Sequence, residues 1–192
     1  MVLAGPSGSG KSRLAAHTGL PVLRLDDFYR SGDDLTLPRV EQGANEGLVD
    51  WDHPDSWHAD DAVRAICELA RTGRTVAPVY DIARNGPSGT HDVELGGSPL
   101  FVAEGIFAQE VVHACRAEGV LAAALCLTQH PTVTFWRRLT RDLREHRKPP
   151  LVLVRRGWAL MWAQRRVVAN AAALGCDVVS PHEALRRIRA LG

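Results

Sequence analysis

Short apolar runs alternate along the chain with stretches whose apolar residues recur every three to four positions. The runs suit strands buried on both faces, and the periodic stretches suit amphipathic helices. The strand candidates are residues 1–4, 21–25, 75–79, 99–103, 121–127 and 176–179. The helix candidates include residues 12–17, 131–148, 158–174 and 182–191. This alternation predicts one open, mostly parallel, doubly wound α/β sheet with helices on both faces.

Two other stretches interrupt this pattern and predict loops. Residues 30–49 and 83–97 are rich in turn-forming residues and show little periodicity, apart from a short strand candidate at 92–95. Another helix is predicted to begin at Asp52-His53-Pro54-Asp55 and to end near Gly73, because a capping acid followed by proline is typical of a helix start. Pro78 favours an edge position for the strand candidate 75–79.

The loop after the first strand candidate carries the strongest chemical signal. Its sequence, Gly5-Pro6-Ser7-Gly8-Ser9-Gly10-Lys11-Ser12, matches G-x-x-x-x-G-K-[ST] between a strand and a helix. In such a P-loop the backbone around Gly8, Ser9 and Gly10 surrounds a polyphosphate, Lys11 reaches the β/γ-phosphates, and Ser12 offers its hydroxyl to Mg²⁺. Arg13 is a further candidate for contact with the nucleotide. The alternative, a flexible Gly-Ser turn that contains a lysine by chance, requires an uncommon coincidence.

Acidic residues follow other strand candidates, and the carboxyl ends of parallel strands meet in one crevice. Asp26-Asp27, Tyr80-Asp81 and Glu104 are therefore expected to lie near the P-loop. Asp26 is a candidate to accept the proton of an acceptor hydroxyl, and Glu104 to hold Mg²⁺ directly or through water. Taken singly, Asp26 and Asp27 are equally compatible with turn or cap positions, and Glu104 with an exposed strand end.

A net charge of +1 conceals an asymmetry between two parts of the chain. Residues 136–166 contain ten Arg or Lys and two acids, which is +8, so the rest of the chain carries −7. In the predicted helix there, the apolar positions expected to face the core are Val133, Trp136, Leu139 and Leu143. Another face of this helix carries Arg137, Arg141, Arg144 and Lys148. We expect this face to close over nucleotide phosphates as a helical lid at about 137–157, with a solvated surface and nucleic-acid binding as alternatives.

Size and composition favour one soluble domain that includes this lid. The 192 residues are 45% hydrophobic, and the four cysteines are far apart, so buried reduced thiols are expected rather than a metal site. No apolar run is long enough to span a membrane, and the N-terminus leads directly into the loop without a signal peptide, which predicts a cytoplasmic protein. Because only four residues precede the loop, we expect the native chain to begin earlier.

Several short motifs together resemble the uridine/cytidine kinases and the wider uridine kinase-like group of P-loop kinases. After Gly5 to Ser12 come, in the order of that family, Asp26-Asp27-Phe28-Tyr29, Trp51-Asp52-His53-Pro54-Asp55-Ser56-Trp57, Pro78-Val79-Tyr80-Asp81, Glu104-Gly105-Ile106 and Arg138-Leu139-Thr140-Arg141-Asp142. The resemblance extends over essentially the whole chain. Several motifs in order are far more specific than the P-loop alone.

This resemblance implies a P-loop NTPase fold and transfer of the γ-phosphate of ATP or GTP to a nucleoside 5′-hydroxyl. Asp26 would activate the hydroxyl and assist with Mg²⁺, and Glu104 would be the magnesium-side acid. Asp52 would accept hydrogen bonds from the ribose hydroxyls. Tyr80 would contact the nucleoside, with Tyr29 and Arg84 as further substrate-site candidates. Arg138 and Arg141 would contact the nucleotide phosphates from the lid.

The sequence departs from this family where the base is recognised. Pyrimidine nucleoside kinases carry a histidine shortly after the Tyr-Asp pair, whereas Tyr80-Asp81 is followed by Arg84 and Asn85. A kinase for nicotinamide riboside, pantothenate or a sugar phosphate is therefore an alternative, with Arg84 or Arg155-Arg156 neutralising an anionic group. A nucleotide-binding regulator without kinase activity is a further alternative. A small-molecule partner is expected, neither nucleic acid nor membrane is expected, and the oligomeric state stays open.

Overall fold

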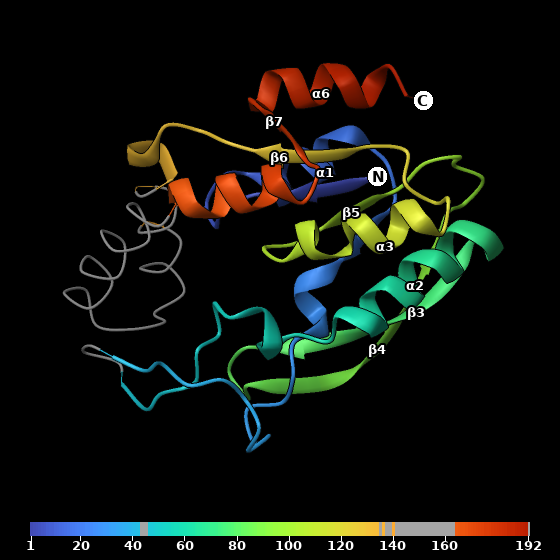
Figure 1. Ribbon diagram of the computed structural model, residues 1–192. Coiled ribbons are helices and arrows are strands. Elements are labelled where there is room, and N and C mark those ends of the chain that lie inside the picture. Colours follow the sequence, from blue (N-terminus) through green and yellow to red (C-terminus); the bar gives the residue numbers. More distant parts are fainter. Residues whose placement is uncertain (43–45, 135, 137–139, 141–163, 192) are drawn as a thin grey trace.

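Five short parallel strands form the central sheet, in the order β2-β5-β1-β6-β7 (Figure 1). The computed structural model describes residues 1–42, 46–134, 136, 140 and 164–191. The strands are β1 (Val2–Ala4), β2 (Val22–Arg24), β5 (Val102–Glu104), β6 (Ala124–Leu127) and β7 (Asp177–Val179). Because all four pairings are parallel, the strands end at one edge of the sheet, where residues far apart in sequence meet.

Helices cover both faces of this sheet, as the apolar runs predict. On one face, Val2 and Ala4 pack with residues of α2 (Ala59–Thr72) and α3 (Val112–Ala117). On the other face, Leu3 packs with residues of α1 (Lys11–Thr18) and α6 (Pro181–Arg189). Figure 1 shows α2 and α3 on one side of the sheet and α6 on the other. Alternate residues of a strand point to opposite faces, so β1 contributes to two cores and is apolar throughout.

A separate antiparallel hairpin lies beside this sheet and corrects two predictions. The strand candidate 75–79 lies within β3 (Arg74–Asp81), which pairs with β4 (Gly86–Glu94) and not with the parallel sheet. Most of the predicted loop at 83–97 is therefore strand β4. The prediction of a loop was wrong because residues 87–92 are all exposed, so they show no apolar alternation. Only one face of the hairpin is covered, with Thr75 and Ala77 buried and Val76 exposed.

The helix predicted to begin at Asp52 begins seven residues later. Pro54–Ser56 forms a single 3-10 turn, η2, in which the Nδ1 of His53 accepts a hydrogen bond from the Asp55 N–H at 3.2 Å. Trp57 is then extended, since it pairs with Tyr29 and donates its indole N–H to the Leu25 carbonyl at 2.7 Å. α2 starts only after this contact and ends, as predicted, before Gly73 in a left-handed conformation. Asp52 is not a helix cap.

The helix predicted from residue 131 begins there, but its inward face differs from the prediction. Val133 and Trp136 are 37% and 61% exposed, whereas Thr134 is only 2% exposed. Among the described residues of this helix the buried position is therefore polar, and the expectation that Val133 and Trp136 face the core was wrong. Leu139 and Leu143 lie outside the described residues. The arginine face and the lid expected at 137–157 lie outside the described residues. In the C-terminal part, residues 164–173 are helical, within the helix predicted at 158–174.

Other expectations concern the cysteines and membranes. All four cysteines are free and buried, and burial raises the pKa of the Cys115 and Cys126 thiols to about 11. Across the described ranges, no helix has the length and apolar character needed to cross a membrane.

The packing of α2 provides a stability test. Leu69 is fully buried in the core, whereas Leu35 is 88% exposed in a loop. Leu69→Ala is expected to lower the free energy of unfolding by about 2–5 kcal/mol, because it leaves a cavity. Leu35→Ala, the matched control, is expected to change it by no more than about 0.5 kcal/mol. Urea denaturation measures both, and equal effects would contradict the assigned core.

Candidate active site

The P-loop has the backbone geometry that its glycines make possible. Gly5, Gly8 and Gly10 have φ values of 141°, 82° and 98°, which side-chain-bearing residues rarely adopt. A Cβ on Gly5 would also lie 2.5 Å from the Leu127 carbonyl oxygen at the end of β6. The loop therefore lies directly against the carboxyl end of a neighbouring strand, and Gly5 allows this close contact.

Lys11 begins α1 and is folded into the loop. Its side chain is 6% exposed, and its ammonium group donates hydrogen bonds to the carbonyls of Gly5 at 2.7 Å and Pro6 at 3.4 Å. Gly10 precedes the helix without a side-chain cap, so the N–H groups of the first helical turn are available to an anion. Ser9 is fully buried and its N–H donates to the Pro6 carbonyl at 3.1 Å. Arg13 is exposed on α1.

Ser12 and Glu104 meet at the carboxyl end of β5. The Ser12 hydroxyl donates to Glu104 Oε1 at 2.9 Å, and Glu104 Oε2 is buried without a hydrogen-bonding partner among the described residues. Burial raises the pKa of the Glu104 carboxyl; Lys11 opposes this rise and Asp26 adds to it. An unpartnered buried carboxylate oxygen beside a hydroxyl supplies the oxygen ligands that Mg²⁺ prefers, so these two residues fit that ion.

Asp26 lies next to this pair although it comes from a different strand. It follows β2 in the 3-10 turn η1 (Leu25–Phe28), and its Oδ1 accepts the Ile106 N–H at 2.8 Å. A Cβ on Gly105 would lie 2.8 Å from the same Oδ1. The absence of a side chain at Gly105 therefore lets the ends of β2 and β5 approach, which places the Asp26 carboxylate beside Glu104.

Asp27 connects this turn to the hairpin. It is 5% exposed, its Oδ2 lies 3.5 Å from Arg24 Nε, and its Oδ1 accepts the Tyr80 N–H at 3.5 Å. Burial raises the pKa of the Asp27 carboxyl, and Arg24 opposes this rise. Tyr80 and Asp81 thus reach the site from an antiparallel hairpin and not, as predicted, from the end of a strand of the main sheet.

Aromatic rings surround the region beyond Asp26. The Tyr29 ring centroid lies 5.8 Å from that of Trp51, 5.6 Å from that of Tyr80 and 5.8 Å from that of Phe107. The Tyr29 hydroxyl donates to the Trp51 carbonyl at 3.0 Å, which joins two distant segments. Trp51 and Phe107 were not among the predicted site residues. Trp51 directly precedes Asp52 in its motif, which is a usable signal, whereas nothing in the sequence marks Phe107.

Two other predicted site residues are exposed to solvent. Asp52 is exposed, and its N–H donates to Asp50 Oδ1 at 3.1 Å. The Arg84 side chain is 76% exposed and lies 3.6 Å from Asp81 Oδ2. The predicted phosphate contacts Arg138 and Arg141 are outside the described residues. The structure thus brings Lys11, Ser12, Asp26 and Glu104 together with Tyr29 and Tyr80, while Arg84 points into solvent.

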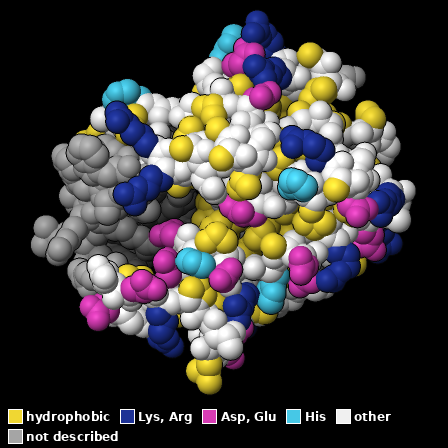
Figure 2. All heavy atoms as spheres, in the orientation of Figure 1, with side chains coloured by type: hydrophobic (Ala, Val, Ile, Leu, Met, Phe, Trp, Pro, Cys, Tyr) yellow, Lys and Arg dark blue, Asp and Glu magenta, His cyan; other side chains and the backbone are white. Residues whose placement is uncertain are grey.

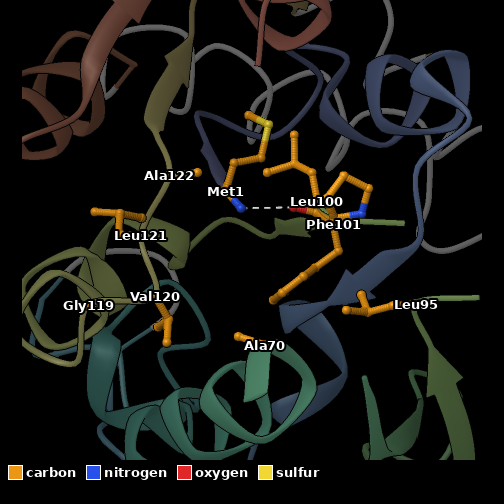
Figure 3. A pocket seen from close by; sticks show the side chains of 10 residues that line it. Met1, Ala70, Leu95, Leu100, Phe101, Gly119, Val120, Leu121 and Ala122 are labelled. Atoms are coloured by element: carbon orange, nitrogen blue, oxygen red, sulfur yellow. Dashed lines mark hydrogen bonds between the residues drawn. The ribbon is translucent and has the colours of Figure 1, made fainter. Parts of the chain in front are cut away.

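A cavity at the other edge of the sheet is separate from this site. Its volume is about 320 Å³, and its walls include Met1, Phe101 and Leu121 (Figure 3). Met1 and Phe101 precede β1 and β5, so the cavity lies at the amino ends of the strands. The P-loop and Glu104 lie at the carboxyl ends.

No family model matches the chain, but individual known proteins are similar to it in sequence. It is 27% identical over 148 residues to a uridine kinase of Saccharomyces cerevisiae and 23% identical over 151 residues to a uridine kinase of Lactobacillus johnsonii. The matched stretches cover 73% and 74% of this chain, but only 28% of the yeast protein and 67% of the bacterial one. The chain is therefore similar in sequence to uridine kinases.

A solved structure shows the same fold. A protein from Silicibacter sp. TM1040, named as a candidate fructose transport system kinase, superimposes with a TM-score of 0.63 at 20% identity, covering 93% of this chain and 87% of that one. This chain therefore has the predicted α/β P-loop NTPase fold. Gly5 to Ser12, Asp26 and Glu104 lie at the carboxyl edge of its parallel sheet, as predicted.

Gly5 allows a direct test of the loop. Gly5→Ala is expected to lower stability by about 1–3 kcal/mol through strain and to abolish binding of inorganic tripolyphosphate, because the loop must move away from Leu127. The control is Gly19→Ala, since Gly19 has a φ of 71° but a Cβ there would meet nothing within 4 Å. It is expected to lose about 1–2 kcal/mol and to keep binding. Calorimetry measures both, and retained affinity in Gly5→Ala would refute the assigned geometry.

Proposed function

We propose that this chain is a kinase that uses ATP or GTP to phosphorylate a hydroxyl of a small metabolite, and that the acceptor is a nucleoside such as uridine or cytidine, modified at its 5′-hydroxyl. One observation carries the proposal. The turn that carries Asp26 contacts both sides of the proposed site: Asp26 Oδ1 accepts the Ile106 N–H at 2.8 Å, close to the Glu104 that binds Ser12, and Oδ1 of the next residue, Asp27, accepts the Tyr80 N–H at 3.5 Å. A kinase needs a proton acceptor between its phosphate donor and its acceptor.

The donor half of the proposed site consists of the P-loop and the first turn of α1. The backbone around Gly8 and Gly10 and the Lys11 ammonium group would hold the phosphates. Ser12 and Glu104 would hold Mg²⁺, with Asp26 nearby. Bound Mg²⁺ would neutralise phosphate charge. Arg13, Arg138 and Arg141 are proposed as further contacts with the nucleotide.

Transfer in this site requires one proton to move. The acceptor hydroxyl oxygen would form a bond to the γ-phosphorus, the bond to the β–γ bridging oxygen would break, and the hydroxyl proton would pass to Asp26. Ile106 N–H holds one Asp26 oxygen at 2.8 Å, so the carboxylate is oriented before substrate binds. Such orientation reduces the entropy lost on reaching the transition state.

The acceptor half consists of Tyr29, Trp51, Tyr80 and Asp52. Three aromatic rings within 6.4 Å of one another offer flat apolar surface to a base. Asp52 is exposed and follows Trp51 directly, so its carboxylate would accept hydrogen bonds from vicinal ribose hydroxyls. Asn85, at the hairpin turn with a φ of 49°, and Arg84 stand where pyrimidine kinases carry a histidine.

Charge distinguishes a nucleoside from the anionic alternatives. Residues 30–55 contain seven acidic and two basic residues, a balance of −5. Figure 2 shows acidic side chains gathered at the lower left, where the loops of this segment lie in Figure 1. A sugar phosphate or pantothenate would be repelled there, and Arg84 is paired with Asp81. Nicotinamide riboside, which is not anionic, remains compatible as a second acceptor.

A panel of acceptors tests the proposal. Purified protein with Mg-ATP or Mg-GTP is expected to phosphorylate uridine or cytidine, with slower or no turnover of pantothenate and sugar phosphates, measured by ADP or GDP release and mass spectrometry of the product. Turnover of nicotinamide riboside alone would keep the kinase and replace the acceptor. If no hydroxyl compound is phosphorylated although ATP binds, the chain is a nucleotide-binding regulator and the proposal fails.

Asp26 is tested by a near-isosteric change. Asp26→Asn is expected to lower kcat by about 10²–10⁴-fold, as for loss of a general base, while the Kd for ATP changes little. Asp81→Asn is the control, because Asp81 lies nearby on the hairpin and has no proposed role in transfer. An equal loss of ATP affinity in Asp26→Asn would show that Asp26 acts on the metal or the fold and not on the proton.

A further inference from the structure

A series of hydrogen bonds connects the P-loop to Thr134, in the helix that begins at residue 131, and to Gln164, in the helix at 164–173. The side-chain amide of Gln129, just after β6, donates to the Ser9 carbonyl at 3.2 Å. The backbone carbonyl of Gln129 in turn accepts a hydrogen bond from the side-chain amide N–H of Gln164 at 2.8 Å. The Gln164 side-chain oxygen lies 2.7 Å from the Thr134 hydroxyl. Residues separated by up to 155 positions, from Ser9 to Gln164, are thus linked through three side chains.

Because two of these side chains are buried, the series of hydrogen bonds allows few alternative arrangements. Thr134 and Gln164 are 2% and 5% exposed, and leaving a buried polar group without its hydrogen bond lowers stability. The side-chain amide of Gln164 has one orientation, because flipping it would place its oxygen against the backbone carbonyl oxygen of Gln129. The Thr134 hydroxyl lies 2.7 Å from both the Pro131 carbonyl and Gln164, so its single proton serves one of them at a time. An apolar pair would fill this space without such constraints.

The contact at Ser9 acts on a peptide group of the phosphate-binding loop. In a trans peptide the C=O of one residue and the N–H of the next point in opposite directions, and the chain contains no cis peptide bonds among the described residues. Holding the Ser9 carbonyl toward Gln129 therefore turns the Gly10 N–H the other way, at the start of α1. Without Gln129 this peptide group can rotate, since Gly10 has little steric restriction.

We propose that Gln129 and Gln164 are positioning residues for nucleotide binding. Gln129 orients the Ser9–Gly10 peptide group, and Gln164 holds Gln129 in place from the helix at 164–173 while Thr134 holds Gln164. Neither glutamine touches the phosphates. This inference rests on the proposed function, because it assigns a cause to the affinity of the P-loop for a polyphosphate.

Two variants and a matched control test the inference. Gln164→Leu and Gln129→Ala are expected to raise the Kd for inorganic tripolyphosphate and for Mg-ATP about three- to tenfold, the effect of losing one neutral hydrogen bond. The control is Gln109→Leu: Gln109 is 4% exposed, its amide reaches Glu110, and it lies outside the P-loop. It is expected to leave both Kd values within twofold. In turnover, the KM for ATP rises in the two variants and the KM for the acceptor does not.

The double variant separates positioning from general destabilisation. If Gln164 acts through Gln129, then Gln164→Leu has no further effect on Kd in the Gln129→Ala background, although it still lowers the melting temperature. Independent, multiplied effects, or unchanged Kd values in both single variants, overturn the inference. Gln129 is only half-buried, so Gln129→Ala remains a folded test if Gln164→Leu does not fold. A wild-type protein that binds neither tripolyphosphate nor ATP overturns the proposed function itself, and with it the inference.

Discussion

The hydrogen bond from Ser12 to Glu104 joins the start of α1 to the end of β5, and the rest of the site depends on that junction. It places the Glu104 carboxylate beside the first turn of the phosphate-binding helix, where Lys11 partly offsets the rise in the Glu104 pKa that burial causes. The junction is possible because β1 and β5 are adjacent and parallel, so both end at the same edge. Gly5 and Gly105 allow the neighbouring backbone segments to approach.

The proposed acceptor half is attached to this junction by a different set of contacts. Ile106 holds Asp26, Asp27 holds the backbone of Tyr80, and Tyr29 holds the carbonyl of Trp51. Segments from distant parts of the sequence therefore meet at the turn that carries Asp26, Asp27 and Tyr29. Residues 30–55 carry a charge balance of −5, and this negative charge lies on the side of the proposed acceptor (Figure 2). Such a field suits an acceptor without negative charge.

Particular elements show why some predictions succeeded and others failed. Strands β1, β5 and β6 are buried on both faces, so their apolar runs were visible in the sequence. The hairpin strand β4 is exposed along residues 87–92, so it had no such pattern and was predicted as a loop. The helix expected from Asp52 starts later because Trp57 is held by Leu25, a contact over 32 residues that no local pattern records.

By itself the sequence determined the α/β class, the parallel sheet and the phosphate-binding loop, because these follow from local periodicity and from a contiguous motif of eight residues. It also identified Asp26 and Glu104 as residues that follow strands. Only the tertiary structure decided that Tyr80 reaches the site from an antiparallel hairpin, that Trp51 and Phe107 join Tyr29, and that Gln129 and Gln164 connect to Ser9. These contacts join residues far apart in the chain, and their geometry depends on strand order and side-chain packing, which no local sequence pattern encodes.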